Sequence, residues 1–198
     1  MPYRFRFSNE EEDKHLDEPL TTYQCRGHTK TGARCKRRCA IPFEYCPAHL
    51  ASNLHLKVKP SLIEGGGKGL FAFDPSLADN AIVFKTNQTI CRYNGGDTTL
   101  QQIDEEYGED ATAPYAVVES GNHVVDAAFP RRGVGSLANH RHLLRNNDAT
   151  LSSNYNNHTV VLKARKNIRN GQEIYVWYGN AYHFDEAGIS FHTKYYKN

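Results

Sequence analysis

The sequence has no long apolar run and little net charge. Nowhere do about eighteen consecutive apolar residues occur, and the N-terminal stretch MPYRFRFSNEEED contains no apolar segment like that of a secretory signal. We therefore expect no membrane contact and an intracellular protein that is not secreted. The formal net charge of +2 is too small for a protein that coats nucleic acid, so any polyanion contact must come from a local basic cluster.

Internal repeats, low-complexity tracts and the common nucleotide-binding motifs are also missing. Glycines crowd the stretch SLIEGGGKGLFAF at 61–73, but there is no Gly-Lys-Ser or Gly-Lys-Thr, which excludes a phosphate-binding loop. The apolar residues after the glycines are typical of a strand rather than a helix, which excludes a dinucleotide fingerprint. At 198 residues, the chain is long enough for one main domain and a small accessory module.

Short apolar runs separated by Gly, Asn and Pro are the most regular feature of the sequence from about residue 55 onward. They predict strands within 54–63, 68–73, 81–85, 90–93, 115–119, 122–127, 159–164 and 173–178. One helix is predicted over 99–108, because Thr99 and Gln102 have capping-box spacing and Gly108 is a stop signal. The sequence therefore predicts a mainly β domain with few short helices.

Four of the five cysteines lie between residues 25 and 46. In a reducing compartment this clustering favours metal ligation over a disulfide framework. Cys25, Cys35, Cys46 and His49 supply the four ligands of a closed structural zinc site, which would stabilise a segment too short for a core of its own. Only the last two have the tight spacing of a zinc knuckle, so unrelated buried thiols are the alternative interpretation.

Two further residues compete for a place in this zinc site, Cys39 and His28. We favour Cys35 over Cys39 because the glycine turn in TKTGARC leads directly up to Cys35. The segment also resembles a small family of modules of the form C…TKxGxRCK…YCxxH, which have no cysteine at the position of Cys39. Phosphates or an acidic protein surface could contact the basic residues of this segment, although a solvated charged face explains them at least as well: Arg26, Lys30, Arg34, Lys36, Arg37 and Arg38.

Three further stretches carry residue types that suit a binding site. The glycines at 65–69 let the backbone adopt positive φ angles and let a ligand approach the main chain, although a bare hairpin turn would use them too. Asn139 and His140 offer donors and acceptors for the polar edge of an adenine or an amino-acid zwitterion, or they could cap a turn. The run QEIYVWYGNAYHF at 172–184 crowds hydroxyl-bearing rings around one glycine, where a plain strand needs only Val and Ile.

Taken together, the three stretches resemble the SET-domain protein lysine methyltransferases. The resemblance depends on their order along the chain: SLIEGGGKGLFA at 61–72, Asn-His at 139–140 and ARKNIRNGQEIYVWYG at 164–179, with ICRYNGG and VVDA between them. It covers roughly residues 55–184. It implies a SET fold, with several small β-sheets and a knot-like C-terminal crossing, and an enzyme that transfers methyl groups from S-adenosylmethionine to a protein lysine.

The resemblance also implies roles for individual residues. Tyr178 is expected to be the catalytic tyrosine at the methyl-transfer site, and Tyr93 a second active-site tyrosine that walls the lysine channel. Val176 and Tyr182 are expected to line this substrate channel. The residues expected to meet the cofactor, in part through backbone groups, are Gly67, Lys68, Gly69, Leu70, Tyr115, Asn139 and His140.

The resemblance further implies a product state and a substrate. In the family, Phe or Tyr two residues before the catalytic tyrosine usually sets how many methyl groups are added. Val176 is smaller and has no hydroxyl to hold a blocking water, so we expect di- or trimethylation. A histone tail is the expected substrate, in the nucleus or the cytoplasm, with the basic zinc module docking on the nucleosome or on nucleic acid. The alternatives are a catalytically weak SET-like binding module and a methyltransferase of non-histone proteins.

The predicted domain organisation has four parts. An acidic flexible arm (1–20) precedes the zinc module (21–52), the SET domain (53–185) and a tail (186–198) that either closes the lysine channel or frays. The chain departs from the family around Ser136, where an Arg is usual, and at HRHLLRNN, where the family often has His-Ser-Cys and Pro-Asn. No cysteine cluster follows the SET segment, so an aromatic residue of the tail could cover the channel instead: Phe191, Tyr195 or Tyr196.

Overall fold

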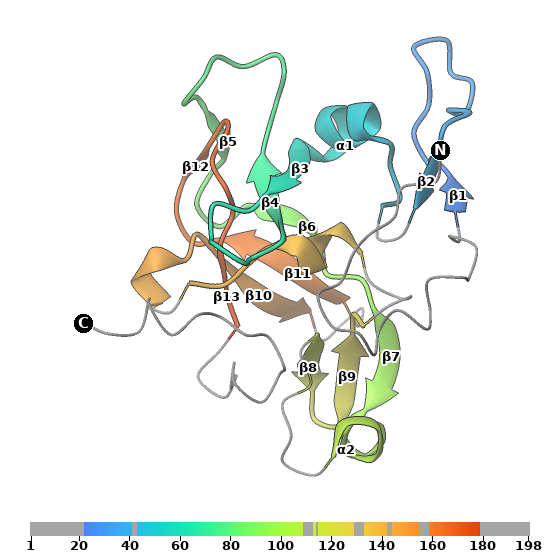
Figure 1. The fold of residues 1–198 in the computed structure, drawn as a ribbon, viewed down its shortest axis with the longest axis vertical. Helices are drawn as coiled ribbons and strands as arrows, with labels where there is room; N and C mark the ends of the chain where they lie inside the picture. Colours follow the sequence, from blue (N-terminus) through green and yellow to red (C-terminus); the bar gives the residue numbers. More distant parts are fainter. Residues whose placement is uncertain are drawn as a thin grey trace.

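The computed structural model describes residues 22–40, 43–108, 113, 115–128, 133–141, 144–154 and 159–178. Within these segments, short strands form five small sheets, and the α-helices are α1 (Pro47–Leu54) and α2 (Leu100–Tyr107) (Figure 1). This confirms the predicted mainly β fold with few short helices. Neither helix is long and apolar enough to cross a membrane. The predicted arm (1–20), Tyr182 and the tail (186–198) lie outside the described residues.

A four-stranded sheet forms the centre of the molecule (Figure 1), in the order β13 (Val176–Trp177), β10 (Ala149–Asn154), β11 (Thr159–Ala164) and β6 (Thr89–Arg92). Along β11 every second side chain is buried, because one face of the sheet packs on the core. β13 runs parallel to β10, with Val176 opposite Ala149. This pairing brings the aromatic run near the C-terminus into the central sheet.

The glycine-rich stretch connects β3 (Leu56–Pro60) and β4 (Lys68–Ala72), which pair antiparallel. β4 is buried from Gly69 to Ala72, so its apolar run fits a strand covered on both faces. In β3, Leu56 points into the core, whereas Lys57 and Lys59 are exposed. The predicted strand at 54–63 is wrong at its start, because Leu54 is the last residue of helix α1. His55, which follows it, adopts the left-handed conformation that ends the helix.

The remaining two sheets outside the N-terminal segment lie apart from each other in Figure 1. A three-stranded sheet, in the order β7 (Gly96–Thr99), β9 (His123–Asp126) and β8 (Ala116–Ser120), lies with α2 at the lower end of the view. The α2 prediction is confirmed: Thr99 and Gln102 form a complete capping box. β5 (Ile82–Phe84) and β12 (Ile168–Arg169) form a small two-stranded sheet of their own.

The N-terminal module consists of the pair β1 (Thr22–Gln24) and β2 (Arg38–Ala40), followed by helix α1. Cys46 caps α1 and Pro47 occupies its first turn, where a proline costs no hydrogen bond. Phe43 and Tyr45 pack against the cysteine cluster of this module and also against the main core. These two side chains therefore join the module to the main core.

Candidate active site and metal site

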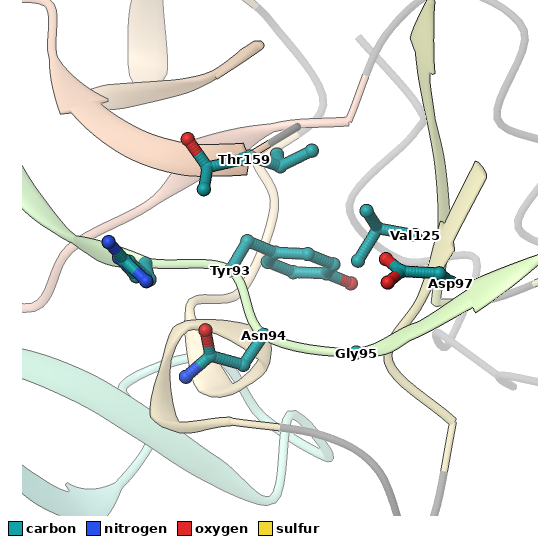
Figure 2. Close-up of a pocket in the computed structure, with 8 residues that line it drawn as sticks. Tyr93, Asn94, Gly95, Asp97, Val125 and Thr159 are labelled. Atoms are coloured by element: carbon teal, nitrogen blue, oxygen red, sulfur yellow. The ribbon is translucent and has the colours of Figure 1, made fainter. Parts of the chain in front are cut away.

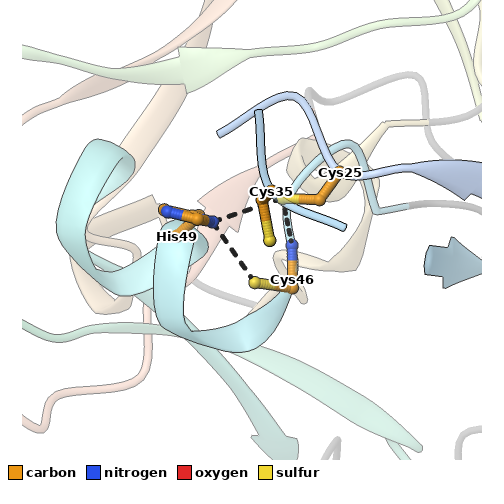
Figure 3. Close-up of side chains that lie close together, drawn as sticks. All are labelled: Cys25, Cys35, Cys46 and His49. Carbon is orange, nitrogen blue, oxygen red and sulfur yellow. Dashed lines mark hydrogen bonds between the residues drawn. The ribbon is translucent and has the colours of Figure 1, made fainter. Parts of the chain in front are cut away.

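The four predicted zinc ligands come together in the N-terminal module (Figure 3). The Sγ atoms of Cys25, Cys35 and Cys46 and a ring nitrogen of His49 all lie within 4.8 Å of one another. Cys25 directly follows β1, whereas Cys46 and His49 lie at the start of α1. Three thiols and one imidazole are a donor set typical of a closed tetrahedral zinc site, so these residues fit the ion.

The ring of His49 is oriented by hydrogen bonds on both nitrogens. Nδ1 lies 3.4 Å from the Sγ atoms of both Cys25 and Cys46, and Nε2 lies 2.8 Å from the carbonyl oxygen of His28. A carbonyl only accepts, so Nε2 carries the proton and Nδ1 is the nitrogen available to a metal. A side chain at Gly27 would collide with this ring. His28 therefore contributes its backbone to the site and not its imidazole.

Two of the thiols lie where ionisation is favoured. Burial opposes ionisation of Cys25, but the backbone N–H groups of Cys46 and Gly27 outweigh it and lower the pKa of Cys25 to about 6. Burial also opposes ionisation of Cys46, yet the backbone N–H of His49 and the guanidinium of Arg37 lower its pKa. Thiolates are the form that binds a metal, so this environment prepares the cluster for a cation.

The other two cysteines of the module differ in position. The Arg37 backbone favours the Cys35 thiolate, but burial and the two neighbouring thiols outweigh it and raise the pKa of Cys35. Burial, reinforced by the charge of Cys25, raises the pKa of Cys39 to about 11. Cys35 belongs to the group of four ligand atoms, whereas Cys39 packs beside it without joining that group. The arrangement agrees with the choice of Cys35 made from the glycine turn.

Tyr178, the predicted catalytic tyrosine, is held by the segment 138–140. Its hydroxyl donates to the carbonyl oxygen of Ala138 over 2.9 Å. Its backbone nitrogen lies 3.2 Å from Nδ1 of His140, which lies equally close to the carbonyl oxygen of Val176. Tyr178 N–H donates to Nδ1 when that nitrogen is unprotonated, and a protonated Nδ1 donates to Val176. In either tautomer, His140 fixes the backbone on both sides of Trp177.

Asn139 connects the end of the aromatic run to the glycine loop. Its carbonyl oxygen accepts from the backbone N–H of Val176 over 2.8 Å, and its Nδ2 donates to the carbonyl oxygen of Lys68 over 3.1 Å. In the loop itself, Gly65 and Gly67 adopt φ angles of 73° and 60°, which glycine reaches without strain. Asn139 thus bonds directly to the predicted cofactor segment 67–70 through the Lys68 carbonyl.

Tyr93 and Tyr115 lie together, although sequence reasoning placed one in the lysine channel and the other in the cofactor pocket. The Tyr93 hydroxyl donates to the carbonyl oxygen of Tyr115 over 3.0 Å. Tyr93 also borders a cavity of about 160 Å³ that Asp97 and Val125 line from the neighbouring sheet (Figure 2). The 3₁₀ turn η2 (Val134–Leu137) packs on β6 and leads directly to the Ala138 carbonyl that holds the catalytic candidate.

Glu173 is the main residue of this region to which sequence reasoning gave no role. Its side chain is 1% exposed, and its carboxylate accepts four hydrogen bonds. The donors are the Ser61 hydroxyl (2.7 Å), the Leu62 backbone N–H (2.7 Å), the Tyr175 hydroxyl (2.8 Å) and Asn139 Nδ2 (3.3 Å). The sequence did offer a signal for this role, because Glu173 belongs to the otherwise apolar run at 173–178. A carboxylate that is buried with such a strand needs hydrogen-bond donors around it.

Comparison with known proteins identifies the family of the chain. The family model described as SET domain matches residues 67–179, which is more than half of the chain. A crystal structure of a Plasmodium falciparum protein, provisionally named a histone methyltransferase, is 19% identical and covers 64% of this chain and 94% of that one, with a TM-score of 0.44. No match was found among curated proteins. The chain belongs to the SET-domain family.

Proposed function

We propose that this protein is an S-adenosylmethionine-dependent protein lysine N-methyltransferase that acts on a histone tail in the nucleus. The observation that carries the proposal is the position of β13 between two sets of contacts. At the C-terminal end of β13, Ala138 and His140 hold Tyr178. Asn139 bonds both to Val176 in β13 and to the glycine loop. One short strand therefore links the predicted cofactor surface to the predicted catalytic phenol.

The chemistry requires an uncharged amine and a well-oriented phenol. A lysine side chain has a pKa of about 10.4 in water, and apolar or aromatic surroundings such as Tyr93 disfavour its charged form. The bound cofactor would supply a methyl group on a positively charged sulfur. Because the Tyr178 proton points to Ala138, the phenol oxygen keeps its lone pairs for weak C–H contacts with that methyl group. Positioning and exclusion of water would supply most of the rate enhancement.

Val176 supports the proposal of di- or trimethylation. It is 1% exposed, lies in β13 two residues before Tyr178, and carries neither a ring nor a hydroxyl. A Val side chain leaves room for a methylated amine and offers no anchor for a water that would block it. Val176→Tyr should shift the product towards monomethyl-lysine, as read by mass spectrometry of the modified peptide.

The zinc ion is proposed to be structural. Cys25, Cys35, Cys46 and His49 would fill all four positions of a tetrahedral ion, which leaves none open for a substrate. The ion would compensate for the small apolar core of the module.

The module is proposed to dock on nucleosomal DNA. Residues 21–52 contain six Lys or Arg and one Glu, whereas the rest of the chain contains 18 Lys or Arg and 21 Asp or Glu. Lys30 and Lys36 are exposed on this segment. Replacing both with Glu should weaken binding to duplex DNA and make it less sensitive to salt, because fewer counterions are released. The same affinity in both proteins would instead favour a solvated charged face.

The decisive experiment uses labelled S-adenosylmethionine with recombinant histones, nucleosomes and non-histone basic proteins. The wild-type chain should label a histone lysine, and Tyr178→Phe should lose at least about a hundredfold in turnover while it still binds the cofactor. Labelling confined to a non-histone protein would overturn the histone assignment. Failure of the wild-type chain to bind the cofactor would overturn the enzyme proposal in favour of a SET-like binding module.

A further inference from the structure

Glu173 lies where the glycine loop, Asn139 and the aromatic run meet. Its carboxylate accepts from Ser61 and Leu62, which begin the loop, and from Asn139, whose amide also donates to the Lys68 carbonyl at the end of the loop. The carboxylate therefore bonds directly to the start of the loop. It is linked to the end of the loop through the side chain of Asn139. A buried charge with this many donors is held in a single position.

Gly69 makes room for this arrangement. A Cβ atom at position 69 would collide with the carboxylate of Glu173. The missing side chain therefore lets the carboxylate lie directly against β4, next to the backbone of the residues expected to meet the cofactor. This gives Gly69 a function in the protein interior, in addition to any contact its backbone makes with a ligand.

Tyr175 extends the network to the segment that follows His140. Its hydroxyl donates to Glu173 over 2.8 Å and accepts from Arg141 Nη2 over 3.2 Å, while the Arg141 guanidinium lies 4.0 Å from the centre of the tyrosine ring. Burial, with the hydrogen bond to Glu173, raises the pKa of Tyr175 to about 12, so its hydroxyl remains a donor. Asn147 bonds both the N–H and the carbonyl of Arg141, which fixes the backbone at this end.

We propose that Glu173 is a positioning residue that sets the affinity for S-adenosylmethionine by fixing the glycine loop against Asn139, with Ser61 and Tyr175 holding its carboxylate. The inference rests on the proposed function and goes beyond it, because it assigns cofactor affinity to residues that do not themselves contact the reacting atoms. Tyr178 is oriented by Ala138 and His140 instead. Loss of the network should therefore affect cofactor binding more than the transfer step.

Three variants test this inference, each measured by calorimetric titration with S-adenosylmethionine and by steady-state kinetics. Glu173→Gln keeps the shape but removes the charge, and should weaken cofactor binding about tenfold or more. Tyr175→Phe and Ser61→Ala each remove one donor, and should weaken binding by about threefold to tenfold. In all three, the KM for the cofactor should rise while kcat at saturating cofactor falls by less.

The matched control is Ile168→Val, which removes one methyl group from a fully buried side chain in β12, outside the network. It should lower Tm without changing cofactor affinity, which separates positioning from general destabilisation. If Tyr175→Phe and Ser61→Ala fold and bind the cofactor as tightly as Ile168→Val, the inference is overturned, even where Glu173→Gln fails to fold. If the wild-type chain binds no cofactor at all, the proposed function falls first.

Discussion

The N-terminal module and the SET core bury their polar atoms in opposite ways. In the module, three thiols and one imidazole face one another, and the apolar side chains packed around them among the described residues are Cys39, Phe43 and Tyr45. In the core, the Glu173 carboxylate is surrounded by donors of the chain itself. The proposed zinc ion would therefore supply the shared partner in the module, whereas the core supplies the partners of Glu173 from its own sequence.

The largest expected effect is removal of the metal. Structural zinc contributes on the order of 10 kcal/mol to small modules, more than the packing of this one could replace. Chelation, or Cys46→Ser, should abolish hydrogen-exchange protection in residues 22–54 while β10 and β11 stay protected. Cys39→Ser is the control and should retain one zinc per chain by metal analysis. Equal protection in Cys46→Ser and wild type would contradict the structural role of the ion.

A smaller effect is expected at the contact between the two regions. Phe43 packs on both the cysteine cluster and the main core, so Phe43→Ala should destabilise the metal-loaded protein by roughly 1–3 kcal/mol in urea unfolding. Tyr23→Ala, at a side chain that is 56% exposed in the same module, should change stability far less. Equal costs for the two variants would show that the module and the core are not joined through Phe43.

The smallest expected effect is the pH dependence of stability that arises from Asp74 and its contact with His55, the residue that follows α1. The Ser76 hydroxyl and N–H, followed by His55, hold the pKa of Asp74 below its usual range. A lowered carboxyl pKa stabilises the fold above the unfolded-state value of about 3.9, and this stability is lost as the pH falls through the folded value. The difference in Tm between wild type and Asp74→Asn should therefore be present at neutral pH and shrink below about pH 4. If the difference in Tm between the two proteins grew as the pH fell, the lowered pKa of Asp74 would be excluded as its cause.

Apolar periodicity and capping residues predicted much of the SET core. β11 alternates buried and half-buried side chains, and α2 has both members of its capping box, so local sequence determines each. β10 was missed because ATLSSN contains little apolar signal and owes its place to pairing with β11 along its whole length. β7 was missed because it begins with Gly and Asp. α1 was missed because its N-cap residue, Cys46, makes no side-chain capping hydrogen bond, which leaves Pro47 in the first turn as its start signal.

The order of the motifs predicted which residues lie near the candidate site, but it did not predict the hydrogen bonds among them. The four predicted zinc ligands lie together and Asn139 contacts the glycine loop, while zinc binding and the roles of Tyr178, Tyr93 and Val176 stay predictions. Glu173 was overlooked because its donors Ser61 and Leu62 lie 112 and 111 residues away along the chain. No local pattern can show such a contact, since only the folded chain brings these residues together.

The hairpin of β3 and β4 has a practical consequence for anyone who trims this protein. The family match begins at residue 67, which cuts the chain inside that hairpin. A fragment that began there would leave the buried strand β4 with an open edge and would strip two donors from an interior anion. Such a fragment should precipitate on expression, and the shortest well-behaved version should begin before Leu56, so that β3 still pairs with β4.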